Sequence, residues 1–463
     1  MEPITLSTIA NWAGGQLLRG DPARTVTEIC TDSRKLKAGD LFLALRGEKF
    51  DAHDFVPQAA KLGAAGVAVA SVDETLPENF AVIQVADTLD ALQKISANYR
   101  ASLPIKVVAI TGSNGKTSTK DFTAAVLGKR FCVVKTEGNL NNHIGLPLTM
   151  LRAKASDEIG VFELGMNHPG EIAPLAKLAR PDVGVITNVG VAHIEFMKTR
   201  DAIALEKGML AEAIGAGGHV VLGADDDYSD AISKRTKATV IFAGLEGGEV
   251  RAENIRSEMD GSHFTLNAHG KSAAARLAVP GRHMVCNALL AVAVGLIFGL
   301  TLDECAAGLA KVQLTKGRLE QKFLHGVRFL DDSYNANPDS MAAALRTLAD
   351  MPGQRIAVLG QMNELGAESE RGHREVGEFA AAQKIDCVIT VGALAAKIAD
   401  AAQQHGVKQT WPTATTADAA EKLREIAREG DTVLIKGSRS VRMETIIEEF
   451  ASANQQSAIS NRQ

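Results

Sequence analysis

Residues 105–119 read IKVVAITGSNGKTST, an apolar β-branched run followed by two glycines and a Lys-Thr pair. The run Ile105–Ile110 is too short and too β-branched for a helix, so it predicts a buried parallel strand. A helix is expected to begin near Lys116, with its free N–H groups and positive dipole end directed at the preceding loop. This order of strand, loop and helix predicts a phosphate-binding loop and a nucleoside triphosphate site.

The residues of this loop have distinct physical roles. Gly112 and Gly115 allow a sharp turn that brings backbone N–H groups against phosphate oxygens. Lys116 reaches the β- and γ-phosphates as a point charge, and the hydroxyl of Thr117 suits a Mg²⁺ ion shared with them. The general pattern G-x-x-x-x-G-K-[ST] has glycine where this chain has Ile110, so the loop is the tighter G-x-x-G-K-T. An accidental turn between strand and helix is the alternative interpretation.

Composition excludes several classes of protein. The chain has 463 residues, 46% hydrophobic and 23% charged, which is ordinary for a globular protein of roughly three domains. Its net charge of −5 leaves no basic surplus, so we expect no nucleic-acid partner. The longest uncharged apolar run, 288–302, falls short of the roughly 20 residues that span a bilayer, so we expect a buried helix and no membrane insertion. The five cysteines match no metal spacing, and the first ten residues show no secretory signal, which favours the cytoplasm.

The chain is predicted to be an α/β protein of three domains. Residues 1–104 form a small α/β domain, and residues 105–316 form a P-loop domain whose mostly parallel sheet is extended by β-hairpins over 250–279. Strand-like and helical runs alternate over residues 317–452, which predicts a doubly wound, Rossmann-like domain. Residues 453–463 are rich in amides and small side chains, so we expect a disordered tail.

Three polar residues of the central domain are candidates for the site. Glu163 ends the apolar run 159–164, and His193 follows the strand-like run 183–187, so both fall at the carboxyl edge where open α/β sheets bind ligands. Beside a nucleotide, Glu163 suits a metal ion, although a solvated acid and a structural histidine are the alternatives. Lys207 lies on a helical run, where most lysines are simply solvated.

Two further segments have open interpretations. Residues 136–147 read TEGNLNNHIGLP, which is too rich in glycine and asparagine for regular structure and predicts a functional loop. Residues 32–34 read Asp-Ser-Arg, which favours a turn but places Arg34 where a guanidinium could hold a phosphate in a forked grip.

Three motifs together resemble those of the Mur ligases, the ATP-dependent amide-forming enzymes that build the peptidoglycan stem peptide. They are ITGSNGKT at 110–117, DDSYNANPDSM at 331–341 and KGSR at 436–439. The resemblance covers nearly the whole chain, and it makes Ile110 part of the family's own form of the loop. The second and third motifs look like those of the member that adds D-alanyl-D-alanine. The Asp-Tyr-Ala-His type motif and the Asp-Asn-Pro-Arg tetrapeptide of the member that adds the third residue are absent.

The resemblance implies ATP and Mg²⁺ as cofactors and assigns roles by position. The residues implied in catalysis are Lys116, Glu163, His193 and Lys207. The residues implied in nucleotide binding are Gly112, Ser113, Asn114, Gly115, Lys116, Thr117, Ser118, Asn287, Arg318 and Asp332. The residues implied in Mg²⁺ binding are Thr117, Glu163, His193 and Lys207. The residues implied in binding the UDP-linked substrate, mostly on domain 1–104, are Ser33, Arg34, Asp51, His53, Asn141 and Asn142. Lys207 is similar to a lysine that family members carry as a carbamate, which turns a cation into an anion able to hold a second Mg²⁺.

The implied reaction adds D-alanyl-D-alanine to UDP-N-acetylmuramoyl-tripeptide through an acyl phosphate, giving UDP-N-acetylmuramoyl-pentapeptide, ADP and phosphate. We expect a cytoplasmic monomer with small-molecule partners only. The alternatives are another amide ligase of the folylpolyglutamate synthase type and a non-catalytic nucleotide-binding regulatory module. The chain departs from the family pattern at Ala52, Met284 and Gln361, where Gly, Asn and Asp are usual. None of these departures touches the phosphate loop.

Overall fold

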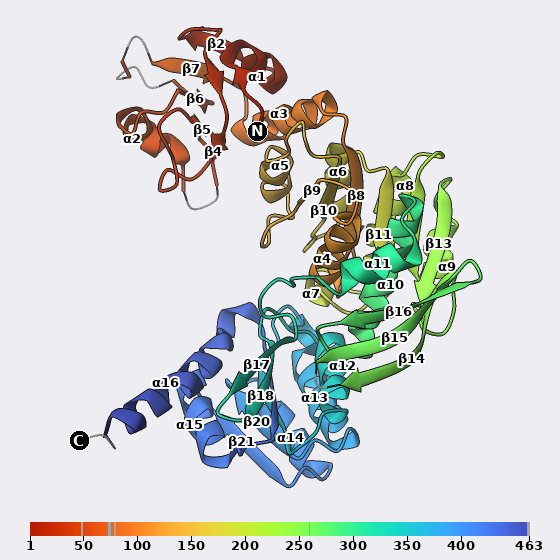
Figure 1. Cartoon of the computed structure of the whole chain (residues 1–463). Coiled ribbons are helices and arrows are strands. Elements are labelled where there is room, and N and C mark those ends of the chain that lie inside the picture. Colours follow the sequence, from red (N-terminus) through yellow and green to blue (C-terminus); the bar gives the residue numbers. More distant parts are fainter. Residues whose placement is uncertain (48–49, 73–75, 78–79, 259, 461–463) are drawn as a thin grey trace.

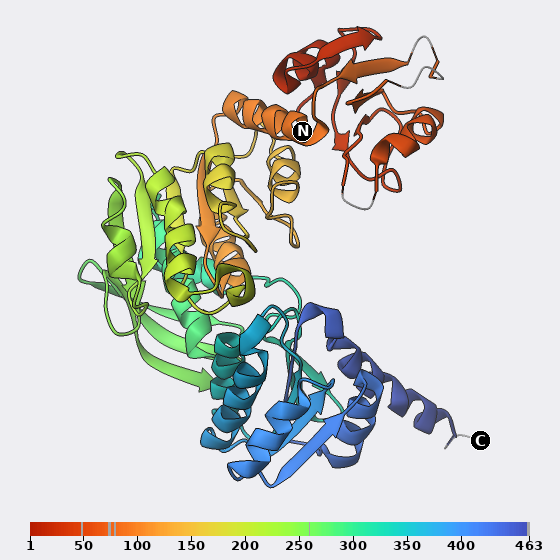
Figure 2. The same ribbon diagram turned by 180° about the vertical axis from the view of Figure 1, so that it is seen from behind.

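The computed structural model describes the whole chain except residues 48–49, 73–75, 78–79, 259 and 461–463. It is a three-domain α/β structure built on three large sheets. The N-terminal domain, in red and orange, and the C-terminal domain, in blue, lie at opposite ends of the molecule, with the central domain between them (Figures 1 and 2). The central domain therefore contacts both of the others.

The N-terminal domain has a five-stranded sheet of order β2-β7-β6-β5-β4, in which β2 is antiparallel to β7 and the other pairs are parallel. Its strands are β1 (Ile4–Thr5), β2 (Gln16–Arg19), β3 (Thr25–Val26), β4 (Ile29–Cys30), β5 (Leu41–Leu43), β6 (Gly66–Val69) and β7 (Ala81–Gln84), and its helices are α1 (Leu6–Ala13), α2 (Val56–Lys61) and α3 (Thr88–Ser102). β1 and β3 form a separate pair. α3 packs on α1 and also on α5 and α6 of the central domain, so it joins the two domains.

The central domain has a nine-stranded sheet of order β16-β15-β14-β13-β12-β11-β8-β10-β9. Its strands are β8 (Lys106–Thr111), β9 (Val133–Lys135), β10 (Ile159–Glu163), β11 (Val183–Ile186), β12 (His219–Gly223), β13 (Thr239–Gly244), β14 (Val250–Glu258), β15 (Gly261–Ala268) and β16 (Lys271–Leu277). All neighbours from β9 to β14 are parallel, while β14, β15 and β16 are antiparallel. The predicted parallel sheet with added hairpins is confirmed.

Helices cover both faces of this sheet. They are α4 (Lys116–Leu127), α5 (Gly145–Met150), α6 (Ile172–Ala179), α7 (Ile194–Met197), α8 (Arg200–Ala213), α9 (Ser229–Ser233), α10 (Arg282–Ile297) and α11 (Leu302–Leu309). Successive side chains of β8 point to opposite faces: Val108 and Ile110 pack with α4 and α10, whereas Val107 and Ala109 pack with α3, α6 and α8. β8 is therefore buried on both sides, as its continuous apolar run predicts.

The C-terminal domain has a six-stranded sheet of order β17-β18-β22-β19-β20-β21, antiparallel only at β17. Its strands are β17 (Glu320–Leu324), β18 (Val327–Asp332), β19 (Arg355–Gly360), β20 (Cys387–Val391), β21 (Gln409–Thr413) and β22 (Thr432–Lys436), and its helices are α12 (Pro338–Ala349), α13 (Ser369–Ala382), α14 (Ala396–Gln404), α15 (Thr416–Ile426) and α16 (Glu444–Ser460). Ile356 and Val358 pack in one apolar cluster and Ala357 and Leu359 in another, so the sheet is doubly wound.

Three segments differ from expectation. The loop predicted for residues 136–147 ends at Gly145, where α5 begins. The side chain of Asn142 accepts the backbone N–H of Gly145 at 2.9 Å, which satisfies one of the free N–H groups at the start of this helix. The apolar run 288–302 is divided between α10 and α11 by a turn at Gly299, whose φ is +80°. Residues 453–460, expected to be disordered, belong to α16, in keeping with the helix propensity of their alanines and glutamines, and residues 461–463 lie outside the described part.

Among the described residues, every helix is too short or too polar to cross a bilayer.

Candidate active site

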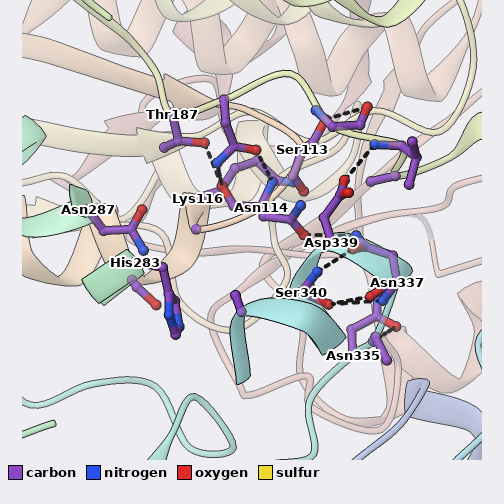
Figure 3. Close-up of a pocket in the computed structure, with 18 of the residues that line it drawn as sticks. Ser113, Asn114, Lys116, Thr187, His283, Asn287, Asn335, Asn337, Asp339 and Ser340 are labelled. Atoms are coloured by element: carbon purple, nitrogen blue, oxygen red, sulfur yellow. Dashed lines mark hydrogen bonds between the residues drawn. The ribbon is translucent and has the colours of Figure 1, made fainter. Parts of the chain in front are cut away.

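A cavity of about 910 Å³ lies between the central and C-terminal domains. From the central domain it is lined by residues 113–118, 187–193 and parts of 283–290, and from the C-terminal domain by parts of 335–346, 363–365 and 436–440. Figure 3 shows Ser113, Asn114 and Lys116 of the loop on one side and Asn337 and Asp339 on the other. The cavity therefore joins the predicted phosphate loop to the motif at 331–341.

The two loop glycines are required by close packing. Gly112 has φ +149°, and a Cβ there would lie 1.8 Å from Oγ1 of Thr187. Gly115 has φ +80°, and a Cβ there would lie 2.3 Å from Oδ1 of Asn287. The same observation places Asn287, a predicted nucleotide-binding residue on α10, directly beside the start of α4. The left-handed backbone and the missing side chains let the loop curl tightly around the end of the helix.

Lys116 folds back over the loop. Its Nζ donates to the carbonyl of Gly112 at 2.8 Å and to that of Ser113 at 3.3 Å. Desolvation by the surrounding protein lowers the pKa of Lys116, Glu163 opposes this effect and Arg318 adds to it. An ammonium whose hydrogen bonds within the described residues are to carbonyl oxygens alone, in a partly desolvated loop, is suited to an anionic ligand.

A hydroxyl and a carboxylate meet below the loop. Thr117 Oγ1 donates to Oε2 of Glu163 at 3.0 Å, and Nδ2 of Asn141 donates to the other carboxylate oxygen at 2.8 Å. Glu163 is buried at the end of β10, and its backbone N–H donates to Oγ1 of Thr136 at 3.0 Å. Arg318 Nη2 approaches Thr117 Oγ1 at 3.3 Å. These oxygens are the ligand type that Mg²⁺ prefers.

His193 faces the C-terminal domain. It has φ +64°, and its Nδ1 lies 2.7 Å from Oε2 of Glu364, which itself has φ +61°. The imidazole of His193 lowers the pKa of the Glu364 carboxyl. Sequence reasoning did not assign Glu364, although the motif GQMNELG at 360–366 after β19 contained it. The signal was its position at a strand end, the same feature that selected Glu163.

Lys207 is buried in α8 and does not line the cavity. Within the described part of the chain, no hydrogen bond or ion pair reaches its Nζ. Burial lowers the pKa of Lys207 well below its usual value, the charge of Lys116 lowers it further, and Glu206 acts in the opposite direction. The lysine therefore has an unusually large neutral fraction, which is the form that reacts with CO₂.

The C-terminal domain contributes charged and polar groups. Asp332 Oδ2 accepts from Nζ of Lys436 at 2.5 Å, and the guanidinium of Arg318 lies 4.2 Å from the ring centroid of Tyr334. Desolvation lowers the pKa of Lys436, and Asp332 opposes this effect. Among the described residues, Nε of Arg318 is buried without a hydrogen-bond partner. A guanidinium with a buried, unpartnered donor beside the loop is suited to an anion.

Direct bonds also cross between the two domains. Asn337 Nδ2 donates to Oδ1 of Asn114 at 2.8 Å, and the backbone N–H of Val191 donates to Oδ2 of Asp339 at 2.8 Å (Figure 3). His283, also on the cavity wall, is half-buried, and desolvation lowers its pKa to about 4. Asn337 and Asp339 were not assigned individually from the sequence, because the motif at 331–341 was recognised as a whole. Val191 and His283 lie outside that motif and were not assigned either.

The predicted substrate residues of the N-terminal domain lie apart from the cavity. Ser33 and Arg34 are in the turn after β4, and Arg34 forms a two-point ion pair with Asp32, at 2.8 and 2.9 Å. This pair lowers the pKa of Asp32 to about 2. The guanidinium of Arg34, predicted to bind a phosphate, is therefore bound to the carboxylate of Asp32 in this structure.

Asp51 and His53 form a local network in the same domain. Nδ1 of His53 lies 2.6 Å from Oδ1 of Asp51, and Nε2 of His53 accepts the backbone N–H of Ala70 at 2.9 Å. Because Nε2 is an acceptor, Nδ1 carries the hydrogen, and it donates a hydrogen bond to the carboxylate of Asp51. His53 thus anchors the end of β6, while Asp51 also accepts from Nε of Arg46 at 2.8 Å.

Comparison with known proteins places this geometry in context. Three family models match the chain: "Mur ligase family, catalytic domain" over residues 25–100, "Mur ligase middle domain" over 110–295 and "Mur ligase, glutamate ligase domain" over 317–439. The chain is 40% identical over 454 residues to the UDP-N-acetylmuramoyl-tripeptide--D-alanyl-D-alanine ligase of Escherichia coli (strain K12), across 96% of this chain and 98% of that relative.

Two solved structures are similar throughout. A crystal structure of MurF from Acinetobacter baumannii has a TM-score of 0.91 at 33% identity, covering 97% of this chain and 99% of that one. MurF ligase from Thermotoga maritima in complex with ADP has a TM-score of 0.84 at 29% identity, covering 93% of this chain and 98% of that one.

Proposed function

The chain belongs to the Mur ligase family, and we propose that it is the ATP-dependent ligase that joins D-alanyl-D-alanine to UDP-N-acetylmuramoyl-tripeptide in peptidoglycan precursor synthesis. The observation that carries this proposal is the interdomain cavity, where the phosphate loop faces the motif at 331–341. That arrangement suits a reaction in which one domain holds the nucleotide and a second domain closes over it.

We assign nucleotide binding to the loop and to three residues outside it. The backbone N–H groups of 112–118 and the ammonium of Lys116 would hold the phosphates, with Lys116 on the γ-phosphate. Asn287, which lines the cavity beside Gly115, would contact the adenine, as the family resemblance implies. Arg318, with its orphaned Nε, and Asp332 would contact the nucleotide from the C-terminal side.

The residues around Thr117 fit Mg²⁺. Thr117 and Glu163 offer a hydroxyl and a carboxylate 3.0 Å apart, and both residues are buried. His193 offers nitrogen, so we assign it a role through a water molecule, and Lys207 would become an oxygen ligand only as a carbamate. When bound, the ion would neutralise the phosphate charge that develops during transfer.

The proposed reaction has two steps. The terminal carboxylate of the tripeptide attacks the γ-phosphate, so that a carboxyl–phosphate bond forms and ADP leaves. The free amine of D-alanyl-D-alanine then attacks the acyl carbonyl, phosphate leaves with the bonding electrons, and the amine loses its proton. Lys116 and the loop N–H groups hold the transferring phosphoryl group, and the contacts between domains exclude water from the acyl phosphate.

The UDP-linked end of the substrate is assigned to the N-terminal domain. We propose that Ser33, Arg34, Asp51 and His53 bind it there, with Arg34 exchanging Asp32 for a phosphate. Asn141, whose side chain donates to Glu163, would contact the peptide part of this substrate near its reacting carboxylate. Asn142 is assigned beside it, although its side chain also accepts the backbone N–H of Gly145 at the start of α5. We further propose that the protein acts as a cytoplasmic monomer.

Phosphate release tests the proposed function. The assay combines ATP, UDP-N-acetylmuramoyl-tripeptide and D-alanyl-D-alanine, and each component is omitted in turn. We expect release only with all three, together with a product heavier by the added dipeptide. Release with a folate and glutamate instead would favour a folylpolyglutamate synthase activity. ATP binding without release under any combination would favour a regulatory module.

A further inference from the structure

A buried carboxylate outside the cavity connects the nucleotide helix to the C-terminal domain. Asp121 lies on α4, one turn after Thr117, and is 2% exposed. Its Oδ1 contacts Nζ of Lys135 at 2.6 Å and Nζ of Lys120 at 3.2 Å. The cavity lining does not include Asp121, so the nucleotide site as described does not use this charge.

The other oxygen of Asp121 holds the segment between α11 and β17. Oδ2 accepts the backbone N–H of Thr315 at 2.9 Å and the hydroxyl of Thr315 at 2.8 Å. Two residues later the chain is bonded to the C-terminal domain instead, because the carbonyl of Gly317 accepts the N–H of Tyr334 at 3.2 Å. Thr315 is therefore held by the central domain immediately before the chain passes to the C-terminal domain.

The segment then turns back onto the nucleotide helix. Three residues after Thr315, Nη2 of Arg318 reaches Oγ1 of Thr117 at 3.3 Å. Thr117 and Asp121 lie on the same face of α4, four positions apart. The helix thus holds the linker at two successive points, one through Thr315 and one through Arg318.

The burial and the charge of Asp121 favour a fixed attachment of Thr315 to α4. Desolvation would raise the pKa of Asp121, but the ammonium groups of Lys120 and Lys135 and the Thr315 hydroxyl outweigh that effect and lower the pKa below its usual value. Lys120 is 1% exposed and donates to the carbonyl of Thr136 at 2.9 Å, whose own hydroxyl accepts the N–H of Glu163. A charged acceptor in such surroundings makes strong bonds to its donors.

We propose that Asp121 is a positioning residue that fixes the linker at Thr315 and so places the Arg318 guanidinium at the phosphate site. This inference rests on the proposed role of Arg318 in nucleotide binding. It gives the central domain control over a residue that contacts the nucleotide from outside that domain.

Binding of a non-hydrolysable ATP analogue by calorimetry tests the inference in the full-length protein. Thr315→Val removes the hydroxyl donor at nearly constant shape and leaves the ion pairs of Asp121 intact, so we expect Kd to rise about tenfold. Thr315→Ser keeps the hydroxyl and should match the wild type. Asp121→Asn should weaken binding at least as much, but it removes the ionic partner of Lys120 and Lys135, so a thermal melt must first show that the variant folds.

The deciding measurement is a double-mutant cycle. If Thr315 acts through Arg318, Thr315→Val should change Kd by less than about twofold in the Arg318→Ala background. The same tenfold effect in both backgrounds would mean that Thr315 supports the fold only, and wild-type binding by Thr315→Val would also overturn the inference. Because the readout is nucleotide binding, a failure here is distinct from a failure of wild-type phosphate release, which would contradict the proposed ligase activity instead.

Discussion

At the scale of single residues, the ammonium of Lys116 lies directly on the proposed phosphate loop. Its bonds are to two loop carbonyls, at 2.8 and 3.3 Å, which a phosphate would replace. We predict that Lys116→Ala lowers phosphate release by at least about a thousandfold, because the transferring phosphoryl group loses its main cationic contact. Circular dichroism should show an unchanged fold. Normal ADP release by the folded variant would contradict this role.

Lys207 allows a chemical test of the carbamate. We predict that Lys207→Ala lowers kcat by about two to three orders of magnitude and that small carboxylates such as formate or acetate restore part of it, since they replace the missing anion. Lys177→Ala, on the neighbouring helix α6, serves as the matched control. Full wild-type rates in CO₂-free buffer, with no added mass on Lys207, would argue against a carbamate.

The same lysine predicts a dependence of stability on pH. The folded pKa of Lys207 lies below its ordinary value of 10.5, so between the two values the unfolded chain binds more protons. Stability should therefore rise as pH increases through that window, and the cost of burying the ammonium is fully present below it. In CO₂-free buffer at pH 7, Lys207→Met should raise the free energy of unfolding by at least about 1 kcal/mol.

Denaturant unfolding at several pH values measures this effect. The gain from Lys207→Met should shrink as pH approaches 10.5, the ordinary pKa of a lysine, and Lys177→Met should show no such trend. A loss of stability in Lys207→Met at neutral pH would mean that the ammonium is well compensated in the folded protein.

At the scale of elements, the turn between β8 and α4 depends on two independent properties of Gly115. Its φ of +80° is costly for any side chain, and its missing Cβ leaves room for Asn287. Gly270, in the turn between β15 and β16, has a similar φ of +71°, but no atom of the described residues lies within 4 Å of the position that a Cβ would take there. Gly270 therefore shares the positive φ of Gly115 without its close packing, so it can serve as a control.

We predict that Gly115→Ala raises the Kd for an ATP analogue at least about tenfold, because the new methyl group displaces Asn287, the residue proposed to contact the adenine. Gly270→Ala should have the same backbone strain as Gly115→Ala, which costs about 1–2 kcal/mol of stability, but it should bind the analogue normally. Calorimetry and thermal melts measure the two effects separately. Equal affinities for both variants would show that Asn287 does not depend on the glycine.

At the scale of the whole molecule, the C-terminal domain is held against the nucleotide loop by a few polar contacts. They join Asn337 to Asn114, Asp339 to Val191, and Glu364 to His193. We predict that Asp339→Ala lowers kcat about tenfold and changes nucleotide affinity less than threefold, because the loop still binds the phosphates while closure is weakened. Asp350→Ala, at the other end of α12, is the control.

Small-angle scattering provides the structural readout for this variant. Asp339→Ala should have a larger radius of gyration than the wild type in the presence of an ATP analogue, and Asp350→Ala should not. An unchanged radius with a reduced rate would place the effect of Asp339 in the cavity itself rather than in the position of the domain.

The sequence alone determined the parts of this protein that depend on neighbours along the chain. The β-branched run and the glycines at 105–115 specify a buried strand followed by a tight turn, since these are local steric preferences. Alternation over 250–279 likewise specified the hairpins, and motif identity specified the family. The polar side chains that follow strand ends, Glu163 and His193, could be proposed as site residues because parallel strands end at one edge of a sheet.

Only the tertiary structure decided how distant segments meet. Asn114 and Asn337 are 223 residues apart, and Asp121 and Thr315 are 194 residues apart, so no spacing in the sequence indicates their bonds. Glu364 became part of the site, and Arg34 paired with Asp32, because the packing of domains and turns sets which polar groups face each other. Local preferences act within a few residues, whereas the placement of a charge opposite its partner depends on the packing of whole domains.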